Sequence, residues 1–189
     1  MLYIKNILES QSCRAAQHEA AYELLSYGLK NEYQLEITKA DIDRTELGKP
    51  FLKAHPHIHF SLSHCKGLVV CLISQLPCGV DCEAVRTAND KIVKRIFTAS
   101  EAEMYHSLID DERNNYFTIL WTLKEAYGKT IGNGLASMSQ ISFDLSDIKS
   151  LPVTVNSDHP DYNFQMLFHN NYHIAVCNYH ASPETIITL

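Results

Sequence analysis

The sequence predicts an α+β protein built from two halves of similar content, residues 1–97 and 98–189. Both halves show helical periodicity, and both contain strand-like runs that can form a small antiparallel sheet against packed helices. One pattern occurs in both halves: a strand, a histidine and a turn precede an apolar run with a cysteine. It is found in "HFSLSHCKGLVVCLI" and in "FQMLFHNNYHIAVCNY". A chain of 189 residues is long enough for one large domain or two small ones.

The first half begins with an amphipathic pattern. A helix is predicted over about residues 13–31, with a buried stripe of Ala16, Ala20, Leu24 and Tyr27 at helical spacing. "HIHFSLS" then alternates as a strand does, and "GLVVCLIS" is a continuous apolar strand. "QLPC" is a turn that leads into "GVDCE", and a helix over about 88–97 follows.

The second half opens with "TASE" at 98–101, which has the capping-box form and predicts a helix start. The longest helix is expected over about 112–129. Its buried stripe comprises Tyr116, Leu120, Leu123 and Tyr127, and its end is marked by Gly128, Gly132 and Gly134. Only strand-like runs come after it, namely "QISFDL", "VTVNS", "YNFQMLF" and "YHIAVCNY".

Composition narrows the class of protein. No apolar run approaches the roughly 20 residues that span a bilayer, so no membrane segment is expected. "MLYIKNILESQ" carries two charges and no small-residue cleavage site, so it is not read as a signal peptide, and a cytoplasmic protein with six reduced cysteines is expected. The net charge of −6 argues against general nucleic-acid binding.

The segment "CGVDCE", residues 78–83, is the first sign of a site. In an extended strand residues i and i+2 share a face, so Asp81 and Glu83 share one face with Gly79. The two cysteines and the valine share the other face, which is expected to be the core side. Two neighbouring carboxylates repel unless a cation lies between them, and Gly79 is expected to leave room for a substrate.

Two metals are candidates for this segment. Hard carboxylate oxygens suit Mg²⁺, which fills its remaining positions with water and substrate phosphate. Zinc would instead need Cys65, Cys78, Cys82 and His64 to converge, and these have no regular zinc-site spacing. The oxygen reading is preferred, and a zinc-dependent structural or regulatory module stays open as the alternative.

The segment "WTLKEAYGK", residues 121–129, strengthens the oxygen reading. Glu125 and Lys129 are one helical turn apart and Lys124 is adjacent. They could form an ordinary surface ion pair worth about 0.5 kcal/mol or less. Functionally, Glu125 would be a third carboxylate for the metal, and the lysines would neutralise phosphate oxygens.

These motifs together resemble the 4′-phosphopantetheinyl transferases of the longer, single-chain type. The resemblance is carried by "GVDCE" and "WTLKEAYGK", with "GKPFL" at 48–52 and "FSLSHC" at 60–65 in the expected order, except that the usual final serine of the last element is Cys65 here. It implies two α+β halves related by pseudo-twofold symmetry, with coenzyme A bound in the cleft between them, and Mg²⁺. The first half would carry the GKP, SHC and GVDCE elements and the second the WTLKEAYGK helix.

The resemblance also implies roles for individual residues. Asp81, Glu83 and Glu125 would ligate the metal. Coenzyme A would be bound by Arg14, Lys49, His64, Lys124 and Lys129. Glu101 matches an acid near the metal-bound water, and it could equally be the capping-box partner of Thr98.

The implied reaction moves 4′-phosphopantetheine from coenzyme A to a serine of an apo carrier protein (peptidyl, polyketide or acyl carrier) and releases 3′,5′-ADP. Lys124 would stabilise or protonate the leaving phosphate, while Glu125, a metal-bound hydroxide or Glu101 would be the base. A monomer suffices for one complete cleft. A basic stripe of Lys91, Lys94 and Arg95 is a candidate carrier dock, and a catalytically idle coenzyme A or carrier binder is a further alternative.

Overall fold

The computed structural model describes residues 1–8, 13–145, 153–180 and 185–189. In chain order the described elements are β1 (Leu2–Asn6), α1 (Arg14–Tyr33), η2 (Lys39–Asp41), β2 (Ile42–Arg44), β3 (Pro50–Leu52), β4 (His59–Cys65), β5 (Leu68–Ser74), β6 (Cys78–Ala84), α2 (Asp90–Ile96), α3 (Ala99–Ser107), α4 (Asp110–Ile131), η3 (Gly134–Gln140), β7 (Phe143–Asp144), β8 (Val153–Ser157), β9 (Tyr162–His169), β10 (Tyr172–Tyr179) and β11 (Ile186–Thr188). The α+β class predicted from the sequence is confirmed.

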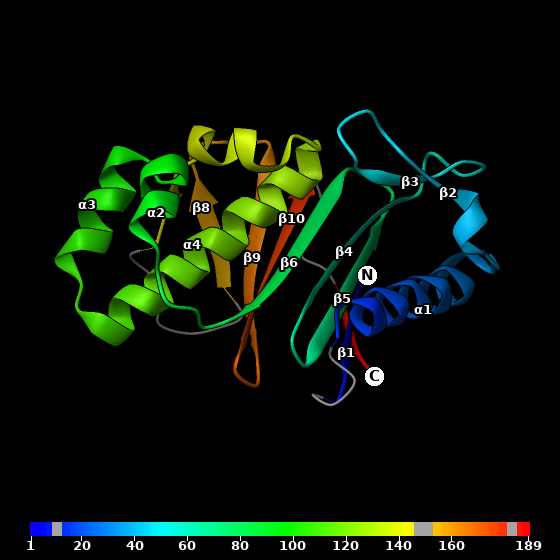
Figure 1. The fold of residues 1–189 in the computed structure, drawn as a ribbon. Coiled ribbons are helices and arrows are strands. Elements are labelled where there is room, and N and C mark those ends of the chain that lie inside the picture. Colours follow the sequence, from blue (N-terminus) through cyan, green and yellow to red (C-terminus); the bar gives the residue numbers. More distant parts are fainter. Residues whose placement is uncertain (9–12, 146–152, 181–184) are drawn as a thin grey trace.

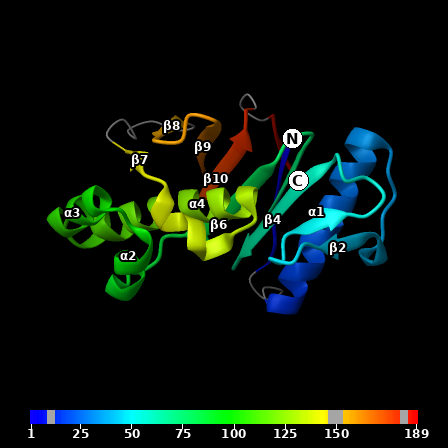
Figure 2. The same cartoon turned by 90° about the horizontal axis from the view of Figure 1, so that it is seen from above.

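Two main sheets organise the fold (Figure 1). The first has the strand order β11-β1-β5-β4, the second has the order β6-β10-β9-β8-β7, and β2 pairs with β3 in a short hairpin. Each main sheet is covered by one long helix, α1 on the first and α4 on the second (Figures 1 and 2). The helix-plus-sheet content of the two halves is therefore similar, as expected.

Strand β5 is apolar from Leu68 to Ile73 because both of its faces are covered there. Alternate residues from Val69 to Ile73 join the apolar cluster beneath α1. The intervening residues from Leu68 to Leu72 join a second cluster against β6 and β10. A third cluster lies between α4 and the other face of the second sheet. Strand β6 therefore has one face in the core between the sheets and one face toward α4.

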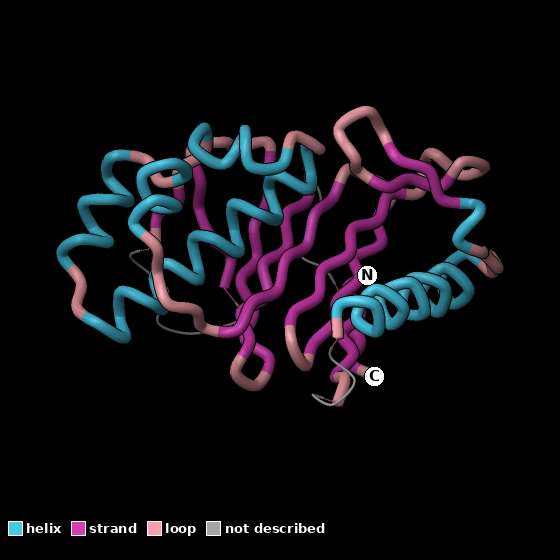
Figure 3. The backbone as a smooth tube through the Cα atoms, viewed as in Figure 1, coloured by secondary structure: helices cyan, strands magenta, loops and turns pink. Residues whose placement is uncertain are grey.

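Each half of the chain contributes one edge strand to the main sheet of the other half. Strand β6 pairs antiparallel with β10 of the second half, and β11 returns to pair parallel with β1 of the first half. As Figure 3 shows, β4 and β6 lie side by side where the two sheets meet. The first sheet is therefore mixed rather than purely antiparallel, and the carboxylates of β6 belong to the second sheet.

Helix α1 buries a stripe that differs from the expected one. Ala20 and Leu24 are buried, but Tyr27 is 47% exposed and Gly28 takes the inward position. A Cβ at Gly28 would come within 2.6 Å of Ile73 Cδ1, so this glycine lets the helix pack closely on the first sheet. Positions three and four residues after Leu24 both fit a helical stripe, so the spacing alone does not distinguish Tyr27 from Gly28.

Helix α4 extends two residues beyond each expected boundary. It ends at Gly132, a left-handed C-cap with φ of 80°. Gly128 was expected to end the helix and instead lies inside it, where a Cβ would come within 2.8 Å of Gly134 O. The capping box at Thr98 and Glu101 is confirmed as the start of α3. None of the helices in the described ranges has the length and apolarity that crossing a membrane requires.

Candidate active site

Gly79 brings helix α4 against strand β6. A Cβ at this position would lie 2.0 Å from Ala126 O and 2.5 Å from Thr130 Oγ1. The expectation that Gly79 leaves space for a substrate is therefore wrong, because the space is filled by the helix backbone. The close approach instead positions the carboxylates of β6 beside the carboxylate of Glu125 on α4.

Asp81 is held from two sides. Its Oδ1 accepts hydrogen bonds from Ser63 Oγ of β4 and from Lys129 Nζ of α4, both at 2.7 Å. Its Oδ2 is buried and has no hydrogen-bond partner within the described residues. A buried carboxylate oxygen without a donor is costly. The side chain is thus fixed in place with one oxygen free for a cation.

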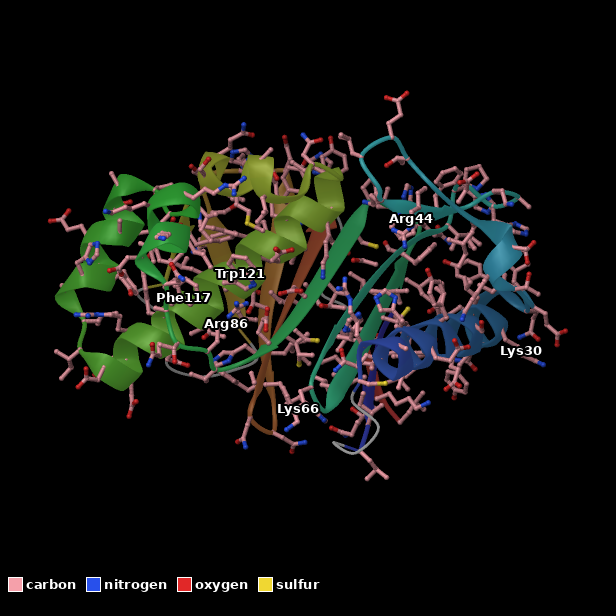
Figure 4. The ribbon with its side chains drawn as sticks, in the orientation of Figure 1. Lys30, Arg44, Lys66, Arg86, Phe117 and Trp121 are labelled. Carbon is pink, nitrogen blue, oxygen red and sulfur yellow. The ribbon has the colours of Figure 1, made fainter. Side chains whose placement is uncertain are left out.

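Glu83 is held by Trp121 in the middle of α4 and by Arg86, which follows β6. Its Oε1 accepts from Arg86 Nη1 and from Trp121 Nε1, both at 3.0 Å, and the Arg86 guanidinium lies 4.9 Å from the centre of the Trp121 ring. Figure 4 shows Arg86 and Trp121 together with Phe117, which stacks on the indole. Burial and the charge of Asp81 raise the pKa of Glu83, and Arg86 and Trp121 oppose this rise.

Glu125 has no hydrogen bond or ion pair in the described part of the chain that would offset its burial. Burial first, and then the charge of Asp81, raise its pKa from 4.5 to about 7, with a smaller contribution from Glu83. The three carboxylates therefore repel one another across the β6–α4 contact. Such a cluster is typical of a site that accepts a cation.

These carboxylates fit a hard cation, although they do not surround one as they stand. No three acid, imidazole or thiol groups in the described ranges are gathered closely enough to hold an ion. The fit rests on the free Oδ2 of Asp81 and on Glu125, whose pKa stays raised by burial and Asp81 although Lys129 and Arg86 oppose the shift. The alternative zinc set is not assembled either: Cys65 and Cys82 approach to 3.9 Å, but the ligand group that zinc needs is missing within those ranges.

Lys129 lies in the seam between the two sheets, which is the line along which β4 and β6 run side by side. Its ammonium donates to Val80 O at 3.0 Å and Leu62 O at 3.4 Å, besides its bond to Asp81. Burial alone would lower the pKa of Lys129, but the Asp81 carboxylate more than offsets this and the pKa is raised. Lys129 is therefore held in the charged form.

Serine hydroxyls complete the same seam. Strands β4 and β6 run alongside each other, and the amides of Val80 and Cys82 donate to Ser61 Oγ at 3.0 Å and Ser63 Oγ at 3.3 Å. The hydroxyls of "SLS" thus accept from the edge amides of β6, on a side where no described strand pairs with its backbone. Ser63 uses its own proton for Asp81, so one hydroxyl links the seam to the carboxylate cluster.

A cavity of about 280 Å³ opens beside this seam. Its lining carries basic side chains from α1, the β2–β3 hairpin, β4 and α4, namely His18, Arg44, Lys49, His64 and Lys129. The rings of His18 and His64 lie 4.8 Å apart. Burial, and then the charges of His18, Lys129 and Arg14, lower the pKa of His64. A cluster of cationic groups around a cavity favours an anionic ligand.

The model of the 4′-phosphopantetheinyl transferase superfamily matches residues 77–177, a range that contains all three carboxylates and Lys129. The chain belongs to this superfamily. It is 31% identical over 150 residues to a 4′-phosphopantetheinyl transferase of Bacillus subtilis, covering 78% of this chain and 67% of the relative. It is 30% identical over 161 residues to the transferase Sfp of Bacillus subtilis strain 168, covering 84% and 72%.

A solved structure of a holo-(acyl-carrier-protein) synthase from Bacillus anthracis, in complex with CoA (3′,5′-ADP), is also similar. The sequence identity is 19% and the TM-score is 0.45, and the match covers 57% of this chain and 97% of that chain.

Within this member of the transferase superfamily, the cavity gathers only part of the coenzyme A set predicted from the sequence. Lys49, His64 and Lys129 line it. Arg14 is the exposed first residue of α1 and does not line the cavity. Arg44 also lines the cavity, although the motifs did not predict it. The signal was its position in the same turn as Gly48 and Lys49. Arg44 Nη1 donates to Gly48 O at 2.8 Å.

Lys124 and Glu101 are placed together, away from the cavity lining. Both are almost fully buried, and Lys124 Nζ lies 2.8 Å from Glu101 Oε2. The ammonium also donates to Met138 O at 2.9 Å and Ile141 O at 2.5 Å. Burial lowers the pKa of Lys124, and Glu101 opposes that shift. In this structure the pair ties α4 to α3 and η3, while the catalytic roles of both residues stay predictions.

Ser63→Ala is expected to destabilise the transferase by about 1–3 kcal/mol, because it leaves the buried Cys82 amide without its acceptor and removes one of the two donors to Asp81 Oδ1, the other being Lys129. At about 2–4 °C per kcal/mol for a chain of this size, the melting temperature should fall measurably in a thermal unfolding scan. Ser74→Ala is the control, because Ser74 accepts only the exposed Leu76 amide. Equal melting temperatures for the two variants would contradict the role assigned to the Ser63 hydroxyl.

Proposed function

We propose that this protein transfers the 4′-phosphopantetheine group from coenzyme A to a serine of an apo carrier protein and releases 3′,5′-ADP. The position of Lys129 carries the proposal. It lines the cationic cavity, and its ammonium contacts Asp81 of the carboxylate cluster at 2.7 Å. A pyrophosphate bound in the cavity would therefore lie next to the carboxylates. Membership of the transferase superfamily supports the same reaction.

The cavity would bind the anionic end of coenzyme A. Lys49, whose Nζ donates to Thr130 O at 2.5 Å, is anchored at one side, and His64 and His18 form the other. His64 Nδ1 is buried without a partner among the described residues, so a phosphate oxygen can be its partner when the ring nitrogen carries a proton. Arg44 adds a guanidinium, which suits the bidentate recognition of a phosphate.

Mg²⁺ belongs to the proposal, with Asp81, Glu83 and Glu125 as its ligands. Carboxylate oxygens suit this ion, and the free Oδ2 of Asp81 and the raised pKa of Glu125 support the assignment. Bound there, Mg²⁺ would supply Lewis-acid stabilisation of the phosphate charge. The residues around it have their own task, since Ser63 and Lys129 orient Asp81 while Trp121 and Arg86 orient Glu83.

Glu125 is the preferred proton acceptor for the carrier serine. Burial and the charge of Asp81 raise the pKa of Glu125 in the metal-free protein, and a carboxylate in such a site is a candidate proton acceptor. Glu101 is less suited, because its two oxygens already accept from the amides of Thr98 and Phe143 and one of them pairs with Lys124. The serine oxygen would bond to the β-phosphorus as the bond to the departing 3′,5′-ADP breaks.

The carrier protein would dock beside these carboxylates. Lys91, Lys94 and Arg95 are all exposed on α2, which suits a partner with acidic surface groups. None of the six cysteines, all of which lie in the described ranges, forms a disulfide, which supports the cytoplasmic location that we propose. A monomer is part of the proposal, because α4 and β4 of one chain already form both walls of the cavity.

Intact-mass spectrometry of an apo carrier protein incubated with this protein and coenzyme A tests the function. We expect the carrier to gain one phosphopantetheine with Mg²⁺ and to stay unmodified with EDTA. Peptidyl, polyketide and fatty-acid carriers should be tried in parallel. No mass gain on any of them, while coenzyme A still binds, would contradict the proposal and identify a catalytically idle binder.

A further inference from the structure

Two cysteines meet where the two sheets join. Cys65 is the last residue of β4, Cys82 lies in β6, and their sulfur atoms are 3.9 Å apart, with the Cys82 thiol directed at the Cys65 sulfur. The neighbouring bonds from Val80 and Cys82 to Ser61 and Ser63 keep the strands side by side in this register. The proposed reaction leaves both thiols unused.

The pair is reachable from solvent on one side only. Cys82 is 1% exposed and belongs to the apolar cluster between the sheets, whereas Cys65 is partly exposed at its edge. The turn that follows Cys65 is tethered to the second sheet by a 2.8 Å bond from Tyr172 Oη to Lys66 O. An oxidant would therefore meet Cys65 first, with Cys82 already in place behind it.

We propose that Cys65 and Cys82 are a reversible disulfide site that switches off the adjacent carboxylate cluster. A hydroperoxide oxidises the Cys65 thiol to a sulfenic acid and is itself reduced to an alcohol, or to water if it is hydrogen peroxide. The Cys82 sulfur then bonds to the Cys65 sulfur, and the hydroxyl of the sulfenic acid leaves as water with the Cys82 proton. Added thiol reverses the bond by exchange.

The bond would act on the site because Cys82 lies between two of the proposed ligands. A disulfide requires sulfur atoms about 2.05 Å apart, so the pair must close by about 2 Å from its present separation. Cys82 and its neighbours Asp81 and Glu83 are on one short strand with opposite faces, so a pull on the cysteine shifts the carboxylates. The bridge would also fasten the first sheet to the second beside Lys129.

The bond itself is tested without any assay of transfer. Reduced protein is treated with hydrogen peroxide, blocked with an alkylating reagent and digested, and we expect a peptide pair linked through Cys65 and Cys82, with the loss of two hydrogen atoms in the intact mass. Cys65→Ser should abolish the linked pair. Cys13→Ser is the matched control, because Cys13 is exposed and has no assigned role. Recovery of Cys65 as thiol or as sulfinic acid only would overturn the disulfide site.

The effect of the disulfide on the carboxylate cluster rests on the proposed function. Two measurements report this effect. Mn²⁺ binding, followed by electron paramagnetic resonance, should weaken on oxidation, and carrier modification should slow by about tenfold or more, because small shifts of catalytic groups have large effects. Dithiothreitol should restore both, and Cys65→Ser should resist both losses. A linked protein that keeps full Mn²⁺ affinity would overturn the switch. Absence of transfer in the reduced protein would instead overturn the proposed function, and the linked peptide and Mn²⁺ binding would still decide this inference.

Discussion

Glu125→Gln is expected to lose about a hundredfold or more of carrier modification and, in EDTA at pH 8, to unfold at a higher temperature than the unmodified sequence. The activity falls because the variant lacks one proposed metal ligand and the preferred base. The stability rises because Glu125 is a charged group with no hydrogen-bond partner among the described residues and two carboxylates nearby. Thermal unfolding and intact-mass assays on the same preparation check both.

The pH dependence of this effect has a defined sign. Folding raises the pKa of Glu125 from 4.5 to about 7, so between these values the folded protein binds more protons than the unfolded chain. Stability without metal should therefore fall as pH rises through this window, and the Glu125→Gln variant should lack that contribution. Glu103→Gln, an exposed change on α3, is the control. A variant that unfolds earlier than the unmodified protein at pH 8 would contradict the repulsive cluster.

Asp81→Asn distinguishes the effect of a carboxylate on transfer from its effect on stability. It should also lose transfer, but its melting temperature should fall, because Lys129 would lose the carboxylate that keeps it charged. Asp81→Asn and Glu125→Gln are therefore expected to lose activity alike but to change the melting temperature in opposite directions. Equal stability changes would show that Asp81 and Glu125 do not differ in the way that their contacts indicate.

Lys124→Met is expected to destabilise the protein by about 3–5 kcal/mol, because it leaves the buried Glu101 carboxylate without its cation. At about 2–4 °C per kcal/mol the melting temperature should drop by roughly 10 °C. Glu101 also caps α3 and accepts the Phe143 amide, so the disturbance should extend over α3 and the start of β7. Thermal unfolding and hydrogen exchange measure both consequences.

Lys94→Met is the matched control for Lys124→Met, because it removes the same charge from an exposed position on α2. The double variant Lys124→Met with Glu101→Gln should recover part of the stability, since it removes both charges. An unchanged melting temperature for Lys124→Met, combined with a large fall in turnover, would show that Lys124 acts on the substrate and not in holding α3 and η3 to α4.

The elements that the sequence predicted best are those specified by local chemistry. The capping box at Thr98, the long helix around Leu120 and the two faces of "CGVDCE" all follow from spacings within a few residues. The continuous apolar strand "LVVCLIS" was also recognised, because a strand buried on both faces has no polar residues to interrupt it.

The errors arose where the role of a glycine depends on which backbone packs against it. Gly79 was read as an open position, but the backbone of α4 occupies that space. Gly128 was read as a helix end, and it is a point of close contact with Gly134. A glycine in a sequence does not show whether it provides a turn, free space or a close approach, because all three depend on which element packs there.

The sequence by itself determined the superfamily motifs, the α+β class and the face of β6 that carries the two acids, because these depend on residue type and on periods of two or 3.6 residues. Only the tertiary structure decided what each group contacts. In the folded protein Lys124 pairs with Glu101, Lys129 lies between β4 and β6, and Cys65 lies next to Cys82. These contacts join residues 17 to 67 positions apart, and those of Lys129 exist because β6 leaves its own half to pair with β10 and packs against α4.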